Sequence, residues 1–264
     1  MEREVQNQLD HRQIPINRVG VKDVHYPIIV LDKTNKTQPT VARVNMFVNL
    51  PHQFKGTHMS RFIEILNQHR GRISLHNFHQ ILDDLIKSLE AKEARVEMEF
   101  PYFIRKQAPV SGEESLMEYL CRYIGERKDG KEEFFVGIAV PVLTLCPCSK
   151  EMCERSAHNQ RGKVTVTLKY KKFFWIEDIV ELIEQSASAP VYALLKREDE
   201  KYLTELAYEN PRFVEDVVRE VTLKLKESGN FPWFRVEAEN YESIHNHNAY
   251  AMVEWGEEEE KNQD

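Results

Sequence analysis

The first half of the chain alternates between two hydrophobic periods. Apolar residues run together or occupy every second position in four segments, which is the pattern of strands. These segments are 26–31, 44–50, 96–100 and 116–124. Between the second and third of them, apolar positions recur every three or four residues, which predicts helices at 59–66 and 75–89. The predicted order is strand, strand, helix, helix, strand, strand.

The second half repeats this order after a turn at Lys128, Asp129 and Gly130. Apolar runs and alternation predict strands at 135–142, 163–170, 234–239 and 249–254. Helical spacing predicts longer helices at 176–183 and 210–225, with a short helix at 203–207. The two halves share this order of elements but no detectable sequence identity. We therefore interpret the repeat as a structural duplication.

The pattern predicts an α+β fold of two ββααββ units, each a four-stranded antiparallel sheet with its helices on one face. The predicted segments are a flexible arm at 1–20, a first module at 21–127, a second module at 131–255, and an acidic disordered tail at 256–264. Open sheets leave edge strands that must be covered or paired. We therefore expect a homo-oligomer and, in particular, a tetramer.

Composition and charge exclude several classes of protein. The chain has 264 residues, of which 41% are hydrophobic and 30% are charged, which excludes a disordered or collagen-like chain. The net charge is −7, and residues 257–264 carry five acidic side chains against one lysine. The rest of the chain is only mildly acidic, which argues against general binding of nucleic acid.

The first thirty residues are interrupted by charged side chains, which leaves no apolar stretch for a signal peptide or a membrane span. We therefore expect a soluble, cytoplasmic protein with no membrane partner. Of the 4 cysteines, Cys146, Cys148 and Cys153 lie within eight residues. In a chain without a leader, such crowding indicates a metal or a reactive thiol more than disulfides.

The cysteine cluster is followed at short distance by a histidine. The two segments are Cys146-Pro147-Cys148-Ser149-Lys150 and His158-Asn159-Gln160-Arg161-Gly162. They lack the paired C-x-x-C hooks of a structural zinc site, but they supply two or three ligands and leave a position open, as a catalytic metal needs. The alternative is that the cysteines are small buried hydrophobes at a strand end and that the histidine is an ordinary loop residue.

Two other segments gather reactive side chains. The segment 242–248 contains His245 and His247, which could supply a metal ligand or a proton shuttle, although by itself this segment is better explained by ordinary turn chemistry. The segment 55–61 places basic and hydroxyl side chains before a predicted helix, where anions bind. A solvated helix cap is the alternative there.

Two glutamates are candidates for binding or catalysis. Glu200 lies in a run of charged residues, and Glu215 borders the apolar stripe of a predicted helix. A carboxylate in the second position could accept the paired N–H donors of a guanine or pterin ring. Either residue could instead be an ordinary surface glutamate.

Five segments occur in order along nearly the whole chain: 50–61, 145–150, 156–162, 199–201 and 242–249. Together they resemble the prokaryotic GTP cyclohydrolases of type IB, which are members of the tunnelling-fold family. The resemblance implies a tandem pair of tunnelling-fold modules, in agreement with the duplication.

The resemblance also implies a reaction: metal-dependent hydrolysis of GTP to 7,8-dihydroneopterin triphosphate and formate. This is the first step towards tetrahydrofolate and, in many bacteria, towards queuosine. Water attacks C8 of the guanine ring and then the resulting formamide, and a divalent metal supplies water of lowered pKa. Enzymes of the family accept zinc, manganese or iron(II), and an archaeal branch makes a cyclic phosphate product instead.

Site residues follow from the matched motifs. The implied metal ligands are Cys146, His158 and Glu200, with Cys148 as an alternative to Cys146. His245 is the implied acid or base and Glu242 orients it, while Glu215 anchors the guanine. The triphosphate, with a contribution across a subunit boundary, is expected to contact Lys55, His58, Ser60, Arg61 and Arg161.

Two rival functions fit parts of the same pattern. A nitrile reductase of the same fold would use a cysteine to form a covalent thioimide with a deazaguanine and would need no metal. A non-catalytic scaffold would use the metal to stabilise the fold and bind a pterin. Replacing a structural metal ligand would unfold the chain, whereas replacing a catalytic one would not.

Overall fold

The computed structural model describes residues 6, 8–70 and 78–257. The predicted tail at 256–264 lies outside the described residues from position 258 onward, as does the start of the helix predicted at 75–89. In chain order the elements are β1 (Ile16–Asp32), β2 (Lys36–Leu50), α1 (Met59–Gln68), α2 (Phe78–Leu89), β3 (Ala94–Gln107), β4 (Glu114–Lys128), β5 (Lys131–Leu145), α3 (Pro147–Met152), β6 (Asn159–Lys169), α4 (Ile176–Glu184), β7 (Ala189–Pro190), α5 (Arg197–Glu209), α6 (Val214–Ser228), β8 (Trp233–Asn240) and β9 (Ala249–Gly256).

The strands form one nine-stranded sheet, in the order β1-β2-β3-β4-β5-β6-β8-β9, with the short β7 paired to β5. The prediction of two tandem tunnelling-fold modules, each with its own four-stranded sheet, was therefore wrong. The reason lies at the turn after β4. Asp129 and Gly130 both adopt positive φ, at 51° and 74°, which turns the chain tightly. β5 therefore lies next to β4, and the sheet continues across the turn. The alternation of apolar and polar residues along a strand does not show which strand lies beside it.

The chain divides into two compact units that share β3, β4 and β5. Unit 1 contains residues 1–101 and 122–135, and unit 2 contains residues 102–121 and 136–264. The predicted module boundaries of 21–127 and 131–255 stay a prediction. β1 begins at Ile16, so the last residues of the segment 1–20 are strand.

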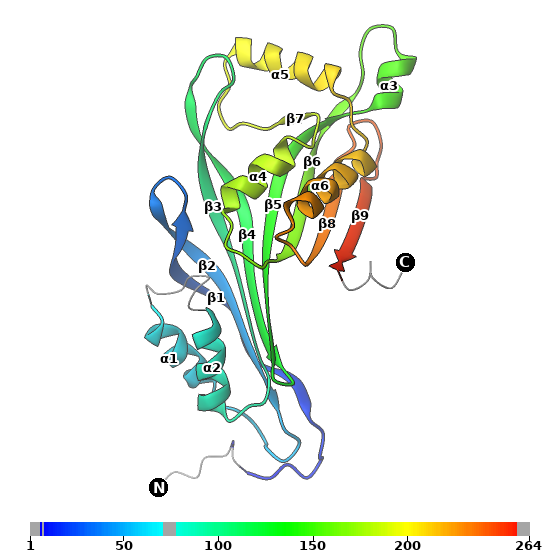
Figure 1. Ribbon diagram of the computed structural model, residues 1–264. Coiled ribbons are helices and arrows are strands. Elements are labelled where there is room, and N and C mark those ends of the chain that lie inside the picture. Colours follow the sequence, from blue (N-terminus) through cyan, green and yellow to red (C-terminus); the bar gives the residue numbers. More distant parts are fainter. Residues whose placement is uncertain (1–5, 7, 71–77, 258–264) are drawn as a thin grey trace. The chain divides into compact units, whose positions relative to one another are not determined.

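In unit 1, α1 and α2 lie together on one side of the strands (Figure 1). Each helix buries a single apolar face, as an amphipathic helix on a sheet must. The buried helix residues are Phe62, Ile65, Leu66, Phe78, Ile81, Leu82 and Leu85. Alternate residues of β2 and β3 are buried too, and they explain the period of two in the sequence.

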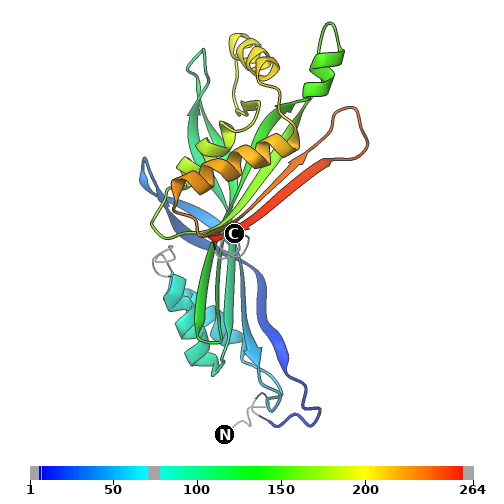
Figure 2. The ribbon, with the colours of Figure 1, turned by 45° about the vertical axis from the view of Figure 1, so that its right-hand side comes forward.

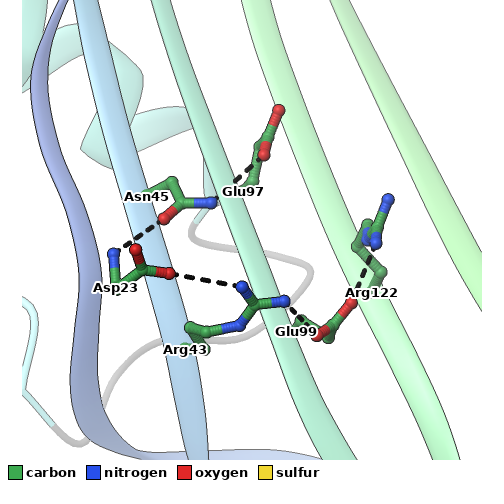
Figure 3. A network of polar contacts seen from close by, with 6 residues as sticks. All are labelled: Asp23, Arg43, Asn45, Glu97, Glu99 and Arg122. Atoms are coloured by element: carbon green, nitrogen blue, oxygen red, sulfur yellow. Dashed lines mark hydrogen bonds and ion pairs between the residues drawn. The ribbon is translucent and has the colours of Figure 1, made fainter.

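Polar side chains of β1 to β4 form a hydrogen-bonded network in unit 1 (Figure 3). Arg43 pairs with Asp23 at 3.2 Å and also with Glu99, which in turn accepts from Arg122 at 2.8 Å. Partial burial acts to raise the pKa of Glu99, but hydrogen bonds from the two arginines outweigh it and leave this pKa below its usual value. The charged side chains of this network form ion pairs with one another, so the network belongs to a polar face of the sheet.

In unit 2, α4 and α6 cover one face of the strands, with α6 extended across them (Figures 1 and 2). The buried residues of α6 are Val214, Val217, Val218, Val221 and Leu225. The sequence places the start of this helix at Asn210, whereas α6 begins at Val214. Asn210 instead caps the end of α5, which is longer than the helix predicted at 203–207.

The start of α5 is tied to the turn between β3 and β4 by one buried carboxylate. Asp199 accepts hydrogen bonds from the backbone N–H groups of Val110 and Ser111 at 2.9 Å each, from the hydroxyl of Ser111 at 2.6 Å, and from Lys196 N–H at 2.8 Å. Burial by itself would raise the pKa of Asp199, but the hydrogen bonds, led by that of the Ser111 side chain, hold this pKa well below its usual range.

We expect Asp199→Asn to lower the thermal midpoint at neutral pH and to weaken its dependence on acid. The lowered folded-state pKa means that Asp199 stabilises the fold above its unfolded pKa of about 3.9. That stabilisation is lost as the pH falls below this value. The amide cannot accept from all four donors, because its NH₂ group would replace an oxygen that accepts from two of them. Thermal melts at several pH values measure this, with Asp129→Asn on an exposed turn as control. Equal acid sensitivity in the wild-type protein and Asp199→Asn would contradict the assignment.

Candidate active site

A pocket of about 280 Å³ lies in unit 2 beside the end of β5 and the start of β6. Its lining comes from the end of β5, the start of β6 and residues 212–215 at the start of α6. The facing ends of β8 and β9 and the connection between them complete it. The residues are Cys146, His158, Gln160, Arg212, Phe213, Val214, Glu215, Asn240, Glu242, His245, His247 and Ala249.

Cys146 and His158 face each other across two paired strands. Leu145 and Asn159 are partners in the β5–β6 ladder, and the next step of the ladder is a bond from Cys146 N–H to the His158 carbonyl at 3.1 Å. The chain between them makes the short helix α3, which Cys146 caps by accepting from Ser149 N–H at 3.5 Å. Strand register therefore brings together a thiol and an imidazole that are twelve residues apart in sequence.

The His158 ring is held by Gln160, which is 6% exposed. The amide nitrogen of Gln160 donates to the Thr144 hydroxyl at 2.9 Å, so its oxygen faces His158 Nδ1 at 3.0 Å. An amide oxygen can only accept, so this contact is a hydrogen bond when Nδ1 carries the proton. A Glu242 oxygen 3.8 Å from the same nitrogen favours that proton as well. This tautomer leaves Nε2 with a free lone pair, as a metal ligand or a base requires.

The connection between β8 and β9 brings three more titratable groups to the pocket. Glu242 is largely buried, with its side chain 11% exposed. The rings of His158 and His245 are 6.4 Å apart, and the rings of His245 and His247 stack at 5.1 Å. Both of these loop histidines are exposed to solvent. The turn at 241–248 therefore assembles proton-carrying side chains beside His158.

Glu215 lies in the first turn of α6, where the helix dipole favours a carboxylate. Asp216, the next residue, accepts from Phe213 N–H at 3.0 Å and so caps the helix. Within the described part of the chain, the Glu215 side chain has no hydrogen bond or ion pair. Its two oxygens are therefore free to accept from a ligand in the pocket.

The structure distinguishes the four cysteines. Cys146 lines the pocket, whereas Cys148 and Cys153 are exposed and do not line it. Cys121 is fully buried, and burial raises the pKa of its thiol far above the usual value, so it stays protonated. Of the two cysteines that the sequence left open as ligands, the geometry favours Cys146.

The donors around the pocket suit a divalent metal in their chemistry, since they are a thiol, imidazoles and carboxylates. His158 adds a feature typical of metal-binding histidines, because its other nitrogen is held by an acceptor. The predicted third ligand, Glu200, is exposed on α5 and does not line the pocket. Within residues 6, 8–70 and 78–257, no group of three or more His, Cys, Asp or Glu is placed to hold an ion.

Most of the residues predicted to bind triphosphate belong to unit 1. His58 and Arg61 line a pocket of about 240 Å³ there, while Lys55 and Ser60 are exposed nearby in sequence. The Arg61 side chain donates to the Ser88 carbonyl at 2.7 Å. Arg161 lies in unit 2, exposed on β6 and outside the lining of the Cys146 pocket.

Sequence reasoning missed Gln160, Arg212 and Asn240. Gln160 lies inside the matched segment 156–162, and Arg212 directly precedes the helix of Glu215, so proximity to these motifs is the signal that points to them. Asn240 pairs with Gly162 across β6 and β8. A Cβ at position 162 would lie 2.6 Å from the Asn240 side chain, so only glycine leaves room for it.

The described helices include none that is long and apolar enough to cross a membrane.

Solved structures show where the fold is found elsewhere. The chain matches the uricase from Bacillus fastidious with a TM-score of 0.58, at 8% identity and over 96% of each chain. It matches the uricase from Arthrobacter globiformis with a TM-score of 0.54, at 9% identity, over 90% of this chain and 93% of that one. These likenesses concern the fold alone. They agree with one large antiparallel sheet, as opposed to the predicted tandem tunnelling-fold modules.

Sequence relatives are much closer. The family model described as "Type I GTP cyclohydrolase folE2" matches residues 3–251. "GTP cyclohydrolase FolE2" of Syntrophus aciditrophicus is 59% identical over 251 residues, which are 95% of this chain and 98% of that protein. The protein of the same name from Syntrophotalea carbinolica is 59% identical over 253 residues, which are 96% of this chain and 95% of that protein. The match confirms the predicted resemblance to type I GTP cyclohydrolases, and the chain belongs to their FolE2 family.

Proposed function

We propose that the pocket of Cys146, His158 and Glu215 is where this chain hydrolyses GTP to 7,8-dihydroneopterin triphosphate and formate, the first step of tetrahydrofolate synthesis. Membership of the FolE2 family supports the reaction. The observation that carries the location is the pairing of Cys146 with His158 at adjacent strand ends, beside the Glu215 carboxylate, which has no partner among the described residues.

Glu215 binds the guanine base in this proposal. The N1–H and N2–H groups of guanine are parallel donors, and a carboxylate accepts from both at once. The Glu215 carboxylate has no competing partner among the described residues, and its place in the first turn of α6 fixes its direction of approach. Because a bidentate contact fixes the plane of the base, it also sets the position of C8.

Cys146 and His158 are the residues that would hold a divalent metal, with manganese, zinc and iron(II) as the candidates. Such a metal supplies water of lowered pKa for attack on C8 and on the formamide that follows. Glu200 remains a predicted further ligand. Gln160 holds the proton on His158 Nδ1, so the Nε2 lone pair points away from that contact and is available to the metal.

His245 is the group that moves protons in this proposal. Ring opening and loss of formate require proton transfer to the departing nitrogen, and histidine titrates near neutral pH. His245 lines the pocket and is exposed, so it exchanges protons with solvent between the two additions of water. Glu242 lies in the same loop as His245 and orients that ring in this proposal, with one of its oxygens 3.8 Å from His158 Nδ1.

Three further assignments extend the proposal. Lys55, His58, Ser60 and Arg61, donated across a subunit boundary, bind the triphosphate together with Arg161, since these residues supply positive charge and hydroxyl donors. The assembly is a tetramer, because β1 and β9 are the end strands of the sheet that the structure describes and each offers an edge to another subunit. The enzyme acts in the cytoplasm, where GTP is available.

Incubating the protein with GTP and each of Mn²⁺, Zn²⁺ and Fe²⁺, and identifying the products by mass, tests this function. The expected products are formate and 7,8-dihydroneopterin triphosphate, with no turnover after chelation of the metal. A cyclic phosphate product would contradict the assigned product while keeping the reaction class. Absence of GTP turnover with all three metals, or metal-independent reduction of a deazaguanine nitrile, would overturn the proposal.

We expect Gln160→Met to lower kcat/KM by about 10- to 100-fold, the usual cost of losing the partner of a metal-binding histidine. Methionine approximates the length of glutamine but cannot accept from His158 Nδ1, so the ring is free to change tautomer and orientation. Metal affinity, measured by calorimetry, should weaken in parallel. Gln185→Met, at an exposed position, is the control. Unchanged metal affinity together with unchanged kcat/KM would show that Gln160 does not position the ring.

A further inference from the structure

Arg212 lines the pocket as a cation without a partner among the residues that the structure describes. Its guanidinium makes no hydrogen bond or ion pair with any residue that the structure describes, and its Nε is fully buried. A buried charged donor without an acceptor costs free energy, which a ligand acceptor would recover. The function proposed above leaves this group unused.

The backbone of Arg212 is held firmly in place. Its N–H donates to the Leu145 carbonyl at 3.0 Å, next to Cys146 in the chain. Two residues earlier, the Asn210 side chain donates to the carbonyls of Ala187 and Ser188, at 2.9 and 3.3 Å. α6 begins two residues later, at Val214. The side chain therefore starts from a fixed point at the pocket wall, as a recognition residue requires.

The surrounding charges indicate which acceptor Arg212 meets. Glu215 and Glu242 line the same pocket, so a triphosphate placed there would face two carboxylates. A neutral base avoids this repulsion. No ion pair joins Arg212 to either glutamate in the part of the chain that the structure describes, so a donor and an acceptor remain separate in one pocket. Guanine offers the complement, since its N1–H and N2–H donors lie beside its O6 and N7 acceptors.

We propose that Arg212 recognises the O6 and N7 atoms of the guanine base whose N1–H and N2–H groups bind Glu215. This rests on the proposed function of the pocket. The guanidinium fork matches O6 and N7 of guanine with two parallel hydrogen bonds. Adenine presents an amino group in place of O6, so the same fork disfavours it. A donor on N7 also draws electron density from C8, the carbon that water attacks. Arg212 therefore serves both base specificity and reactivity.

Equilibrium binding of guanosine and 7-deazaguanosine to the wild-type protein and Arg212→Gln tests the proposal without turnover and without phosphate. The two nucleosides differ only in the N7 acceptor. We expect Arg212→Gln to weaken guanosine binding by about 10- to 100-fold, the value of a hydrogen bond to a charged group. The wild-type protein should bind guanosine more tightly than 7-deazaguanosine, and the variant should bind both equally. The difference between these two preferences is the coupling free energy between Arg212 and N7, as in a double-mutant cycle.

Matched variants separate the alternatives. Arg212→Lys keeps the charge but not the fork, so it should restore little binding. Arg219→Gln, on the exposed side of α6 and paired with Asp216, should bind guanosine like the wild-type protein. Thermal melts confirm that each variant is folded.

Two results would overturn the assignment. One is an unchanged preference for guanosine over 7-deazaguanosine in Arg212→Gln. The other is a loss of GTP binding with guanosine binding intact, which would assign Arg212 to the phosphates. A wild-type protein that does not turn over GTP would refute the proposed function instead, and the nucleoside binding would still decide the role of Arg212.

Discussion

Replacing His158 or Cys146 by alanine is expected to lower kcat for GTP by about 10³-fold or more while the protein stays folded. A metal centre contributes several kcal/mol to stabilising the transition state, which corresponds to a factor of this size. The fold should survive because the contact between the two residues in the β5–β6 ladder is made by backbone atoms, from Cys146 N–H to the His158 carbonyl. Steady-state kinetics with saturating metal and a thermal melt of each variant measure both parts.

The controls use the same residue types away from the pocket. Cys153 is exposed and does not line the pocket, and His79 is exposed on α2. Cys153→Ala and His79→Ala are therefore the control variants. Both should keep wild-type kcat. Normal turnover in Cys146→Ala or His158→Ala would remove that residue from the site. Unfolding of both variants would instead favour the metal-stabilised scaffold, in which the metal contributes folding free energy.

Glu215→Ala is expected to lower kcat/KM for GTP at least ~100-fold, since it removes two hydrogen bonds from the base to a carboxylate, each worth about 1.5–3 kcal/mol. Weaker ground-state binding should raise KM, and loss of alignment at C8 should lower kcat. Glu215→Gln keeps one acceptor oxygen and should lose less. Steady-state kinetics separate the two parameters.

The matched control for Glu215 lies on the same helix. Glu227→Ala removes an exposed carboxylate near the other end of α6 and should keep wild-type kinetics. The Glu215 carboxylate also interacts with the helix dipole, so Glu215→Ala is expected to lose a few tenths of a kcal/mol of stability. A kcat/KM within about twofold of the wild-type value would show that Glu215 does not hold the base. Such a loss is much smaller than the one expected from removing a single charged hydrogen bond.

The candidate site was only partly predictable. The motif around Cys146 and His158 indicated a metal site, and the structure brings these two residues together in one pocket with Glu215, Glu242 and His245. Glu200 and Arg161, which came from the same matched motifs, do not line that pocket. A motif records which side chains a family uses, but it does not say which of them share a pocket in one chain.

Gln160 and Arg212 show why the rest of the site was missed. Neither residue type is unusual in a strand or before a helix, and their roles arise from neighbours distant in the sequence. Gln160 matters because Thr144 orients its amide, and Arg212 matters because its backbone bonds to Leu145. Such contacts depend on strand register and loop placement, which no local pattern encodes.

The sequence by itself determined the main strands and long helices of this protein, though not α3 or β7, and the chemistry of its central cluster. Burial on one face imposes a period of two on a strand and of three to four on a helix, so these elements are local properties. The tertiary structure decided that the strands form one sheet, because the partner of β4 depends on the turn at Asp129 and Gly130. It also decided which polar groups meet at the pocket, since register places Cys146 opposite His158. Pairing between strands is a non-local choice, and the alternation of side chains is the same whichever neighbour a strand takes.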